Sequence, residues 1–202
     1  MLVRFAWQHE AMTSVKSRVN RSIAVVLVLL TLAVTAQSGS ESVDALRSGA
    51  ALSSWVVWFS VVVLWLPEMQ VDSTRIVVRN PLRSFIIPFG QIIQLDARYS
   101  LRIRTANQSI PVWVGPAPGV ITSTLVRLDP TYKRGRTETT VPISQAAGTE
   151  SGNAFELVNR PWRRLVEDGS LDTSQAIVSH WNSGALWFLL VPVAVTVAAG
   201  VL

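Results

Sequence analysis

The chain of 202 residues is 49% hydrophobic and only 15% charged, its formal net charge is +5, and it contains no cysteine. Charged residues make up roughly a quarter of an average soluble domain, so their low share points away from an ordinary soluble protein. Without cysteine the chain cannot form disulfides, iron–sulfur clusters, thiolate nucleophiles or cysteine-type zinc sites. The positive charge favours anionic partners, namely lipid headgroups, an acidic protein surface or nucleic acid.

The first apolar block lies at residues 22–40 and follows a basic N-terminal segment, residues 1–21, in which Met12 is an alternative start to Met1. About 20 apolar residues in a helix cross the roughly 30 Å hydrocarbon core of a bilayer, so we expect a membrane span here. A signal peptide is the alternative. It is disfavoured because no good cleavage site follows and a second apolar block comes soon after.

Two further apolar blocks, residues 48–67 and 182–202, complete a prediction of three spans. The loop between the first two, residues 41–47, has a single arginine, whereas arginine is frequent before residue 22 and after residue 68. We therefore expect a multi-pass protein of the bacterial cytoplasmic membrane. The positive-inside rule places its N-terminus and its long central segment on the cytoplasmic side. Tryptophans near the block ends are expected to be membrane-interface anchors, and these are Trp55, Trp65, Trp181 and Trp187.

Residues 68–115 change from a helical period to a period of two. In "TRIVVR" and "YSLRIRT" charged and apolar side chains alternate, and "NP" and "ANQS" are turn signals. Short antiparallel strands with one buried face and one solvated face are the structure that this pattern predicts.

The run "LPEMQVDSTRIVVRNPLRSFIIPFGQIIQLDARYSLRIRTANQSIPVWV", residues 66–114, resembles the bacterial pleckstrin-homology-like (PH-like) domain of small actinobacterial membrane proteins. The shared features are a strand followed by "RNPLR", an aliphatic-Pro-aromatic segment with "QI" just after it, and a strand that ends in a polar turn. The chain is similar in this respect to the low-molecular-weight antigen 6 PH-domain family, which places two membrane helices directly before the domain. The resemblance implies a partly open β-barrel or strongly bent sheet. The long segment and third span that follow depart from the family's simplest form.

Residues 116–160 are rich in Gly, Pro, Ser and Thr and are expected to be an extension, into which the β domain can continue to about residue 145. Residues 161–181 are expected to form short cytoplasmic or interfacial helices. Pro161 suits the first turn of one helix, and Asp172 suits the N-cap of the next.

Little in the sequence indicates chemistry. The two histidines, His9 and His180, are far apart, and the adjacent Glu167 and Asp168 would point apart on a helix. We therefore predict no catalytic residue, metal, cofactor, small-molecule substrate or nucleic-acid partner. The candidate contact for anionic lipid or a protein partner is a basic face of the sheet. Its expected members are Arg75, Arg79, Arg83, Arg102 and Arg104. The alternative is a solvated face that merely obeys the positive-inside rule.

The predicted fold class is therefore an α+β membrane protein, with three transmembrane helices and a small antiparallel PH-like cytoplasmic domain. The predicted function is that of a non-catalytic accessory or scaffold subunit of a larger actinobacterial membrane complex, with a respiratory assembly as the first candidate host. Its partners would be membrane lipids and other subunits of the complex. The alternative is a stand-alone PH-domain membrane protein that senses anionic lipid or a peptide.

Overall fold

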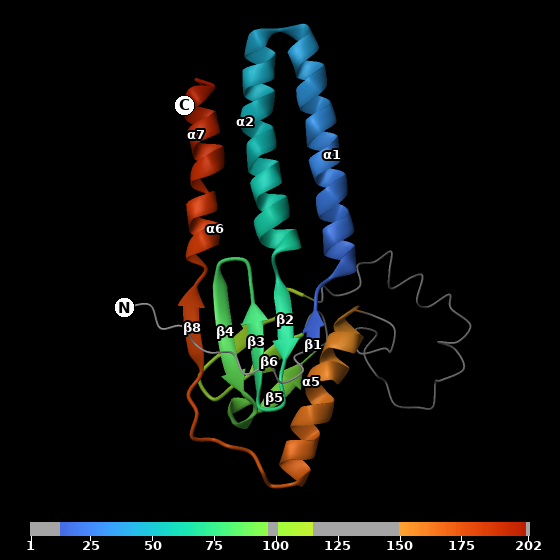
Figure 1. Cartoon of the computed structure of the whole chain (residues 1–202), viewed down its shortest axis with the longest axis vertical. Helices are drawn as coiled ribbons and strands as arrows, with labels where there is room; N and C mark the ends of the chain where they lie inside the picture. Colours follow the sequence, from blue (N-terminus) through green and yellow to red (C-terminus); the bar gives the residue numbers. More distant parts are fainter. Residues whose placement is uncertain (1–12, 97–100, 115–149, 201–202) are drawn as a thin grey trace, which may run out of the picture. The chain divides into compact units, whose positions relative to one another are not determined.

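The computed structural model describes residues 13–96, 101–114 and 150–200. The fold is α+β, with helices and two small antiparallel sheets (Figure 1). The chain divides into two compact units, which we call the helical unit and the β unit. The helical unit takes its described residues from Lys16–Glu68, Arg79–Ser84 and Ser179–Leu202, and the β unit from Met1–Val15, Met69–Val78 and Phe85–Val178.

A helical hairpin forms most of the helical unit (Figure 1). Helix α1 (Arg18–Glu41) begins where the Ser17 hydroxyl accepts a hydrogen bond from the backbone N–H of Asn20. Helix α2 (Val43–Phe59) continues directly into the π-helix η1 (Ser60–Trp65). Ser42 ends α1 and, through its hydroxyl, also caps α2, which makes the turn between the two helices very short.

Two helices are long and apolar enough to cross a membrane, namely α1 with 24 residues and the run Val43–Trp65 with 23 residues. Only 11% and 17% of their most apolar windows are buried, whereas the core helix of a soluble protein is mostly buried. The expected spans at residues 22–40 and 48–67 lie almost entirely within these helices. At the expected third span, α6 (Ser183–Phe188) and α7 (Leu190–Ala198) form one shorter apolar helix.

Hydroxyl groups join the helices. The Thr35 and Ser53 hydroxyls lie 2.6 Å apart and connect α1 to α2. The indole N–H of Trp55 donates to Thr196 Oγ1 over 3.0 Å and connects α2 to α7. Thr196 in turn donates to the carbonyl oxygen of Pro192, so its hydroxyl both accepts and donates a hydrogen bond. Polar side chains of these apolar helices therefore find partners on a neighbouring helix.

The larger sheet has five strands in the order β1-β2-β3-β4-β8. The chain enters it at β1 (Thr13–Val15), which pairs antiparallel with β2 (Glu68–Val71). The hairpin of β3 (Arg75–Arg79) and β4 (Arg83–Pro88) follows, and β8 (Val178–Trp181) completes the sheet. The division between the units falls within this sheet, so the β3–β4 turn belongs to the helical unit.

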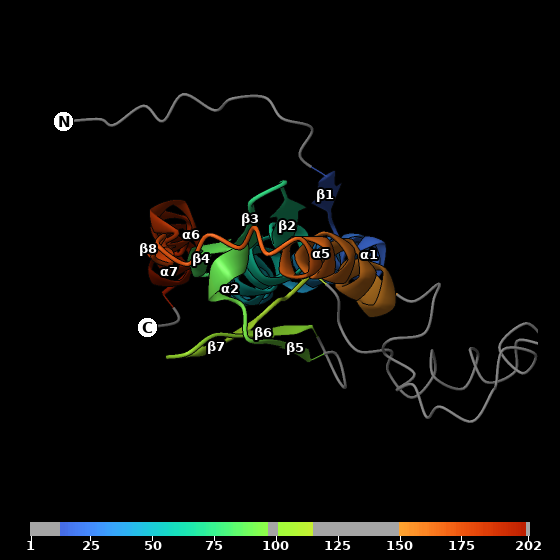
Figure 2. The ribbon, with the colours of Figure 1, turned by 90° about the horizontal axis from the view of Figure 1, so that it is seen from below.

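The smaller sheet is antiparallel and has three strands. They are β5 (Gln94–Asp96), β6 (Arg102–Arg104) and β7 (Ser109–Pro111). Figure 2 shows them as a layer separate from helix α5 (Glu150–Glu167). The alternation in the sequence therefore predicted the β3–β4 hairpin, β6 and β7 correctly.

Both sheets and α5 contribute to one hydrophobic core in the β unit. Ile76 comes from the larger sheet, Ile103 from the smaller one, and Ala154 and Val158 from α5, and all four are fully buried. Ala154 and Val158 are four residues apart and thus share one face of the helix. Trp162 and Leu165 extend that face toward the helix end.

Three expectations about the C-terminal half are wrong. Pro161 lies inside α5 rather than in its first turn. Asp172 caps no helix, because Val178–Trp181 forms strand β8 of the larger sheet. The expected extension is helical from Glu150 onward, while its earlier part and the possible continuation of the β domain to about residue 145 lie outside the described residues.

Candidate functional site at the basic end of the helical unit

The five arginines predicted to share one face of a sheet lie on two sheets. Arg102 and Arg104 flank the buried Ile103 on β6 of the three-stranded sheet, and their side chains are exposed. Arg75, Arg79 and Arg83 lie on β3 and β4 of the five-stranded sheet. The expectation of one basic face is therefore wrong, because the sequence alternation does not reveal which strands pair.

Two of these arginines in the β unit have acidic neighbours. Arg75 Nε lies 3.5 Å from Asp72 Oδ2, and Arg104 Nη2 lies 3.6 Å from Asp96 Oδ2. The Arg104 pair is cross-strand, since β5 and β6 are neighbours in the sheet. Local pairs of this kind leave less positive charge for a partner than the sequence indicates.

Glu68 connects three separate segments of the helical unit. Its Oε2 lies 3.4 Å from Lys16 Nζ and 3.7 Å from Arg79 Nη1. Lys16 precedes α1, Glu68 follows η1, and Arg79 ends β3. The Glu68 side chain is only 10% exposed, so the two cations replace water around its carboxylate.

The β3–β4 turn is held by the segment that enters α6. Asn182 donates from its side-chain amide to the carbonyl oxygen of Asn80 over 2.7 Å and accepts from the hydroxyl of Ser84 over 2.6 Å. Its backbone N–H donates to the carbonyl oxygen of Leu82 over 2.9 Å. One side chain thus satisfies polar groups on both sides of the turn.

Arg83 is fixed beside the same segment. Its Nη2 donates to Ser179 Oγ over 2.9 Å, and its guanidinium carbon lies 5.7 Å from the centroid of the Trp181 ring. This distance is in the range of a cation–π contact. The arginine and the exposed tryptophan therefore form a mixed cationic and aromatic surface.

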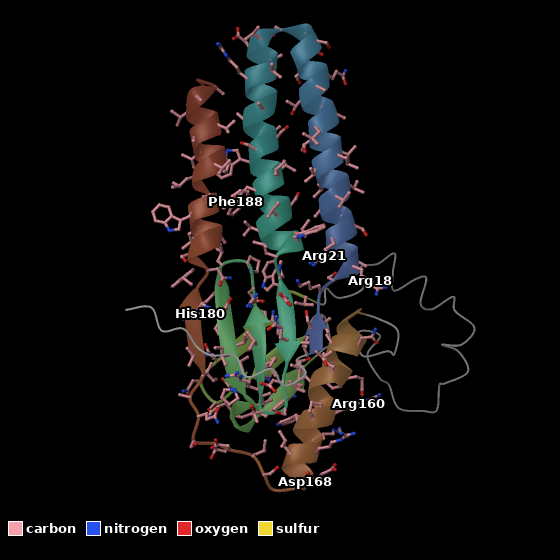
Figure 3. The ribbon with its side chains drawn as sticks, in the orientation of Figure 1. Arg18, Arg21, Arg160, Asp168, His180 and Phe188 are labelled. Atoms are coloured by element: carbon pink, nitrogen blue, oxygen red, sulfur yellow. The ribbon has the colours of Figure 1, made fainter. Side chains whose placement is uncertain are left out.

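Arg21 makes the closest cation–π contact of the helical unit's described residues. Its guanidinium carbon lies 4.8 Å from the centroid of the Trp65 ring, which joins the first turns of α1 to the last residue of η1. Its Nε is buried and has no hydrogen-bond partner among the described residues. Figure 3 shows Arg21 and Arg18 at the same end of α1.

Charge is distributed unevenly between the two ends of the helical unit. Among the described residues one end has five cations and one carboxylate, and we call these six residues the basic end: Lys16, Arg18, Arg21, Glu68, Arg79 and Arg83. At the turn between α1 and α2, Glu41 and Asp44 stand against Arg47 alone. The basic end can attract an anion, whereas the opposite end has a slight excess of negative charge.

Of the four predicted interface tryptophans, Trp65 and Trp181 lie at the basic end and are 41% and 61% exposed. Trp187 lies in α6 and is 71% exposed. Trp55 lies about 18 Å along its helix from Val43, near the middle of the run, and bonds to Thr196. Trp55 therefore makes a contact between helices, and its role as an interface anchor stays a prediction.

The described part of the chain contains no group of three or more His, Asp or Glu side chains that could hold a metal ion. His180 is exposed on β8, and Asp168 is exposed just after α5 (Figure 3). Glu167, the last residue of α5, is exposed as well. A recess of about 340 Å³ in the β unit is lined among the described residues by amide, hydroxyl and apolar side chains. These groups can donate and accept hydrogen bonds, but they do not titrate near neutral pH.

Sequence reasoning found Lys16, Arg18 and Arg21 only as a signal of orientation, and it missed Glu68 and Asn182. The position of Glu68 directly after a long apolar run was a signal in the sequence that could have identified it. Asn182 has no comparable signal, because its partners are about a hundred positions away in the sequence.

Comparisons with sequence profiles of protein families, with curated proteins and with solved structures give no match for this chain.

Proposed function

We propose that the chain is a membrane-embedded, non-catalytic accessory or scaffold subunit of a larger membrane complex. The observation that supports this most is how the polar groups of the helices are used. The Thr35–Ser53 and Trp55–Thr196 contacts join helix to helix, and no ionisable residue lies between Arg21 and Glu41 or between Arg47 and Glu68. Transporters and proton relays place ionisable groups in such helices. These helices instead have the features of an anchor.

The proposed orientation places the basic end in the cytoplasm. Five cations lie there against one at the α1–α2 turn, and the positive-inside rule counts these residues. The proposal includes a third span formed by α6 and α7. Its support is the contact of α7 with α2 and the exposure of large apolar side chains around it, including Trp187, Leu190 and Val197.

The β unit is proposed to be a PH-like docking domain. Its support is the resemblance of residues 66–114 to that family and the contribution of both small sheets to a single core. An actinobacterial origin is part of the same proposal and rests on the resemblance alone, and a respiratory assembly is the first candidate among host complexes that also include cell-envelope machinery and transporters.

Purification from native membranes in a mild detergent tests the accessory role. We expect the full chain, tagged at one end, to co-migrate with other membrane proteins in a particle much larger than the 22.1 kDa chain. A parallel preparation in a harsh detergent is the control, because it should release the chain from its partners. Migration as a lone monomer in the mild detergent would contradict the proposal.

A second candidate is a stand-alone membrane protein that senses anionic lipid or a peptide, and the concentration of cations at the basic end favours it. Each basic residue near an anionic leaflet contributes about 1 kcal/mol of attraction. Reconstitution of the full chain in neutral and anionic bilayers distinguishes it. A sensor changes its proteolysis pattern with lipid charge, whereas a pure scaffold does not.

A further inference from the structure

We propose that the basic end binds the phosphate of an anionic phospholipid headgroup, with Arg21 as the main contact and Arg18 beside it. This inference rests on the proposed insertion in a membrane. It assigns the lipid contact to the helical unit, whereas the sequence placed it on the arginines of the sheet. The guanidinium carbon of Arg21 lies 4.8 Å from the centroid of the Trp65 ring, so the ring shields one side of this group. The N–H edges of the guanidinium are therefore the part that meets a ligand, and they match a phosphate geometrically.

The described residues of the basic end include more cations than carboxylates, and this excess attracts an anion. Glu68 is the one carboxylate among its described residues, and Lys16 and Arg79 already contact it. Arg83 donates to Ser179 Oγ, whereas Arg21 contacts the Trp65 ring. The Nε of Arg21 is buried and has no acceptor among the described residues, so the terminal Nη groups are the part of the guanidinium that we expect to meet the phosphate.

An apolar stripe next to these arginines indicates a phospholipid rather than a free anion. Val25, Leu29 and Leu32 follow Arg21 at i+4, i+8 and i+11, so they lie on the same side of α1 and farther along the helix. They are 46%, 60% and 58% exposed. A headgroup phosphate at Arg21 therefore allows its acyl chains to run along this stripe, whereas inorganic phosphate would gain nothing from it. Trp65, 41% exposed, lies where interfacial aromatic residues are expected.

A simpler alternative is that Arg21 only reaches toward water and fixes the orientation of α1 through its charge. Arg47, at the opposite end of the same helical hairpin, provides a matched comparison. It is also an arginine in the first turns of a helix, but it is exposed, pairs with Asp44 over 3.3 Å and has no contact with an aromatic ring among the described residues. A general effect of arginine charge predicts equal responses at the two positions, whereas a phosphate site predicts a response at Arg21 alone.

The test uses the full chain in vesicles of phosphatidylcholine, with or without phosphatidylglycerol, and in phosphatidylcholine vesicles with inorganic phosphate. Thermal unfolding and mass spectrometry of retained lipid are measured for the unsubstituted protein, Arg21→Gln and Arg47→Gln. We expect phosphatidylglycerol to raise the Tm of the unsubstituted protein and of Arg47→Gln, and Arg21→Gln to retain about fivefold less phosphatidylglycerol.

Two results would overturn the lipid site. One is an equal response of Arg21→Gln and the unsubstituted protein to phosphatidylglycerol. The other is an equal stabilisation by inorganic phosphate, which would identify a simple anion site. Carbonate extraction of each vesicle sample separates this inference from the proposed function. Release of the chain by carbonate contradicts membrane insertion itself, whereas a retained chain with an unresponsive Arg21 position contradicts only the lipid site.

Discussion

The side-chain amide of Asn182 donates a hydrogen bond to the carbonyl oxygen of Asn80 over 2.7 Å, which ties the β3–β4 turn to the start of α6. The same side chain accepts from Ser84, and the backbone N–H of Asn182 donates to Leu82. A turn that contains a proline, as this one does at Pro81, exposes carbonyl groups that cannot all pair within the hairpin. Asn182 provides the missing donors and so determines where the turn lies in the helical unit.

Asn182→Ala should destabilise the protein by about 1–3 kcal/mol, because it leaves the Asn80 carbonyl and the Ser84 hydroxyl without these partners in a partly buried place. Thermal unfolding in detergent measures the loss. Asn153→Ala, at an exposed position of α5, is the control and should stay within about 0.5 kcal/mol. Equal stability of the two variants would show that the hydrogen bonds of the Asn182 side chain contribute nothing to the free energy of unfolding.

Glu68→Gln should cost about 1–2 kcal/mol, because it removes the shared partner of Lys16 and Arg79. The estimate is well below that for a fully buried ion pair, since the two cations are 38% and 49% exposed and water can solvate them. A double-mutant cycle with Arg79→Gln isolates the interaction. The second substitution should cost less in the Glu68→Gln background than alone, and strict additivity would argue against a coupled pair.

The sequence predicted elements that depend on local pattern and missed those that depend on a distant partner. The apolar runs of α1 and α2 and the alternation of "TRIVVR" were sufficient for the two long helices and the β3–β4 hairpin. Strand β8 was mistaken for a helix, because its hydrogen-bonding partner β4 is about a hundred residues earlier in the chain. The N-terminal part of α5 was missed, because Gly152 and Pro161 disfavour a helix locally while Ala154 and Val158 are buried in the core.

The candidate site shows the same limit. Positive charge at the start of α1 was evident from the sequence, and so was the basic character of the sheet. The contact of Arg21 with Trp65 was not evident from the sequence, because the two residues come from different helices and meet only when the helical hairpin forms. The pairing of the strands into two sheets also separates the five arginines of the expected basic face. Charge counts predict the sign of a surface, but the residues that share it depend on tertiary structure.

Gly90→Ala should destabilise the β unit by about 1–3 kcal/mol. A Cβ at position 90 would overlap the backbone carbonyl of Asp172, which cannot rotate away as the tip of a side chain can. The adjacent Gln91 amide donates to the carbonyl oxygen of Thr173 over 2.9 Å, so the same clash would weaken that contact. Gly184→Ala is the matched control, because nothing lies within 4 Å of its added Cβ. Thermal unfolding should show a lower Tm for Gly90→Ala only.

The stability of the turn at Asp172 should depend on pH. Hydrogen bonds from the Ser174 hydroxyl, then from the Ser174 backbone N–H and the Gln175 amide, hold the pKa of Asp172 below its ordinary value of 3.8. A carboxyl with a lowered pKa in the folded state contributes stability that is present above the unfolded-state value and lost as the pH falls through the folded-state value. The Tm of the unsubstituted protein should therefore fall more steeply below pH 3.8 than that of Asp172→Asn. Identical slopes would exclude a contribution from this group.

Thr196→Val should weaken the contact between α2 and α7 by about 1 kcal/mol. The substitution keeps the shape of the side chain but removes the acceptor of the Trp55 indole N–H, which lies near the middle of its helix. Thr31→Val is the control, because the Thr31 hydroxyl donates only to the carbonyl oxygens of Leu27 and Val28 within its own helix. Unfolding in increasing denaturing detergent should affect the Thr196 variant more than the Thr31 variant.

The Trp55→Phe substitution completes this experiment, because it removes the donor instead of the acceptor. If the hydrogen bond holds α7 against α2, Thr196→Val should cost less in a Trp55→Phe background than alone, since the bond is already absent. A disulfide introduced between the two helices would report the same contact by its rate of formation. Equal effects of the Thr196 and Thr31 substitutions would show that the indole N–H finds another partner, and that packing alone keeps α7 beside α2.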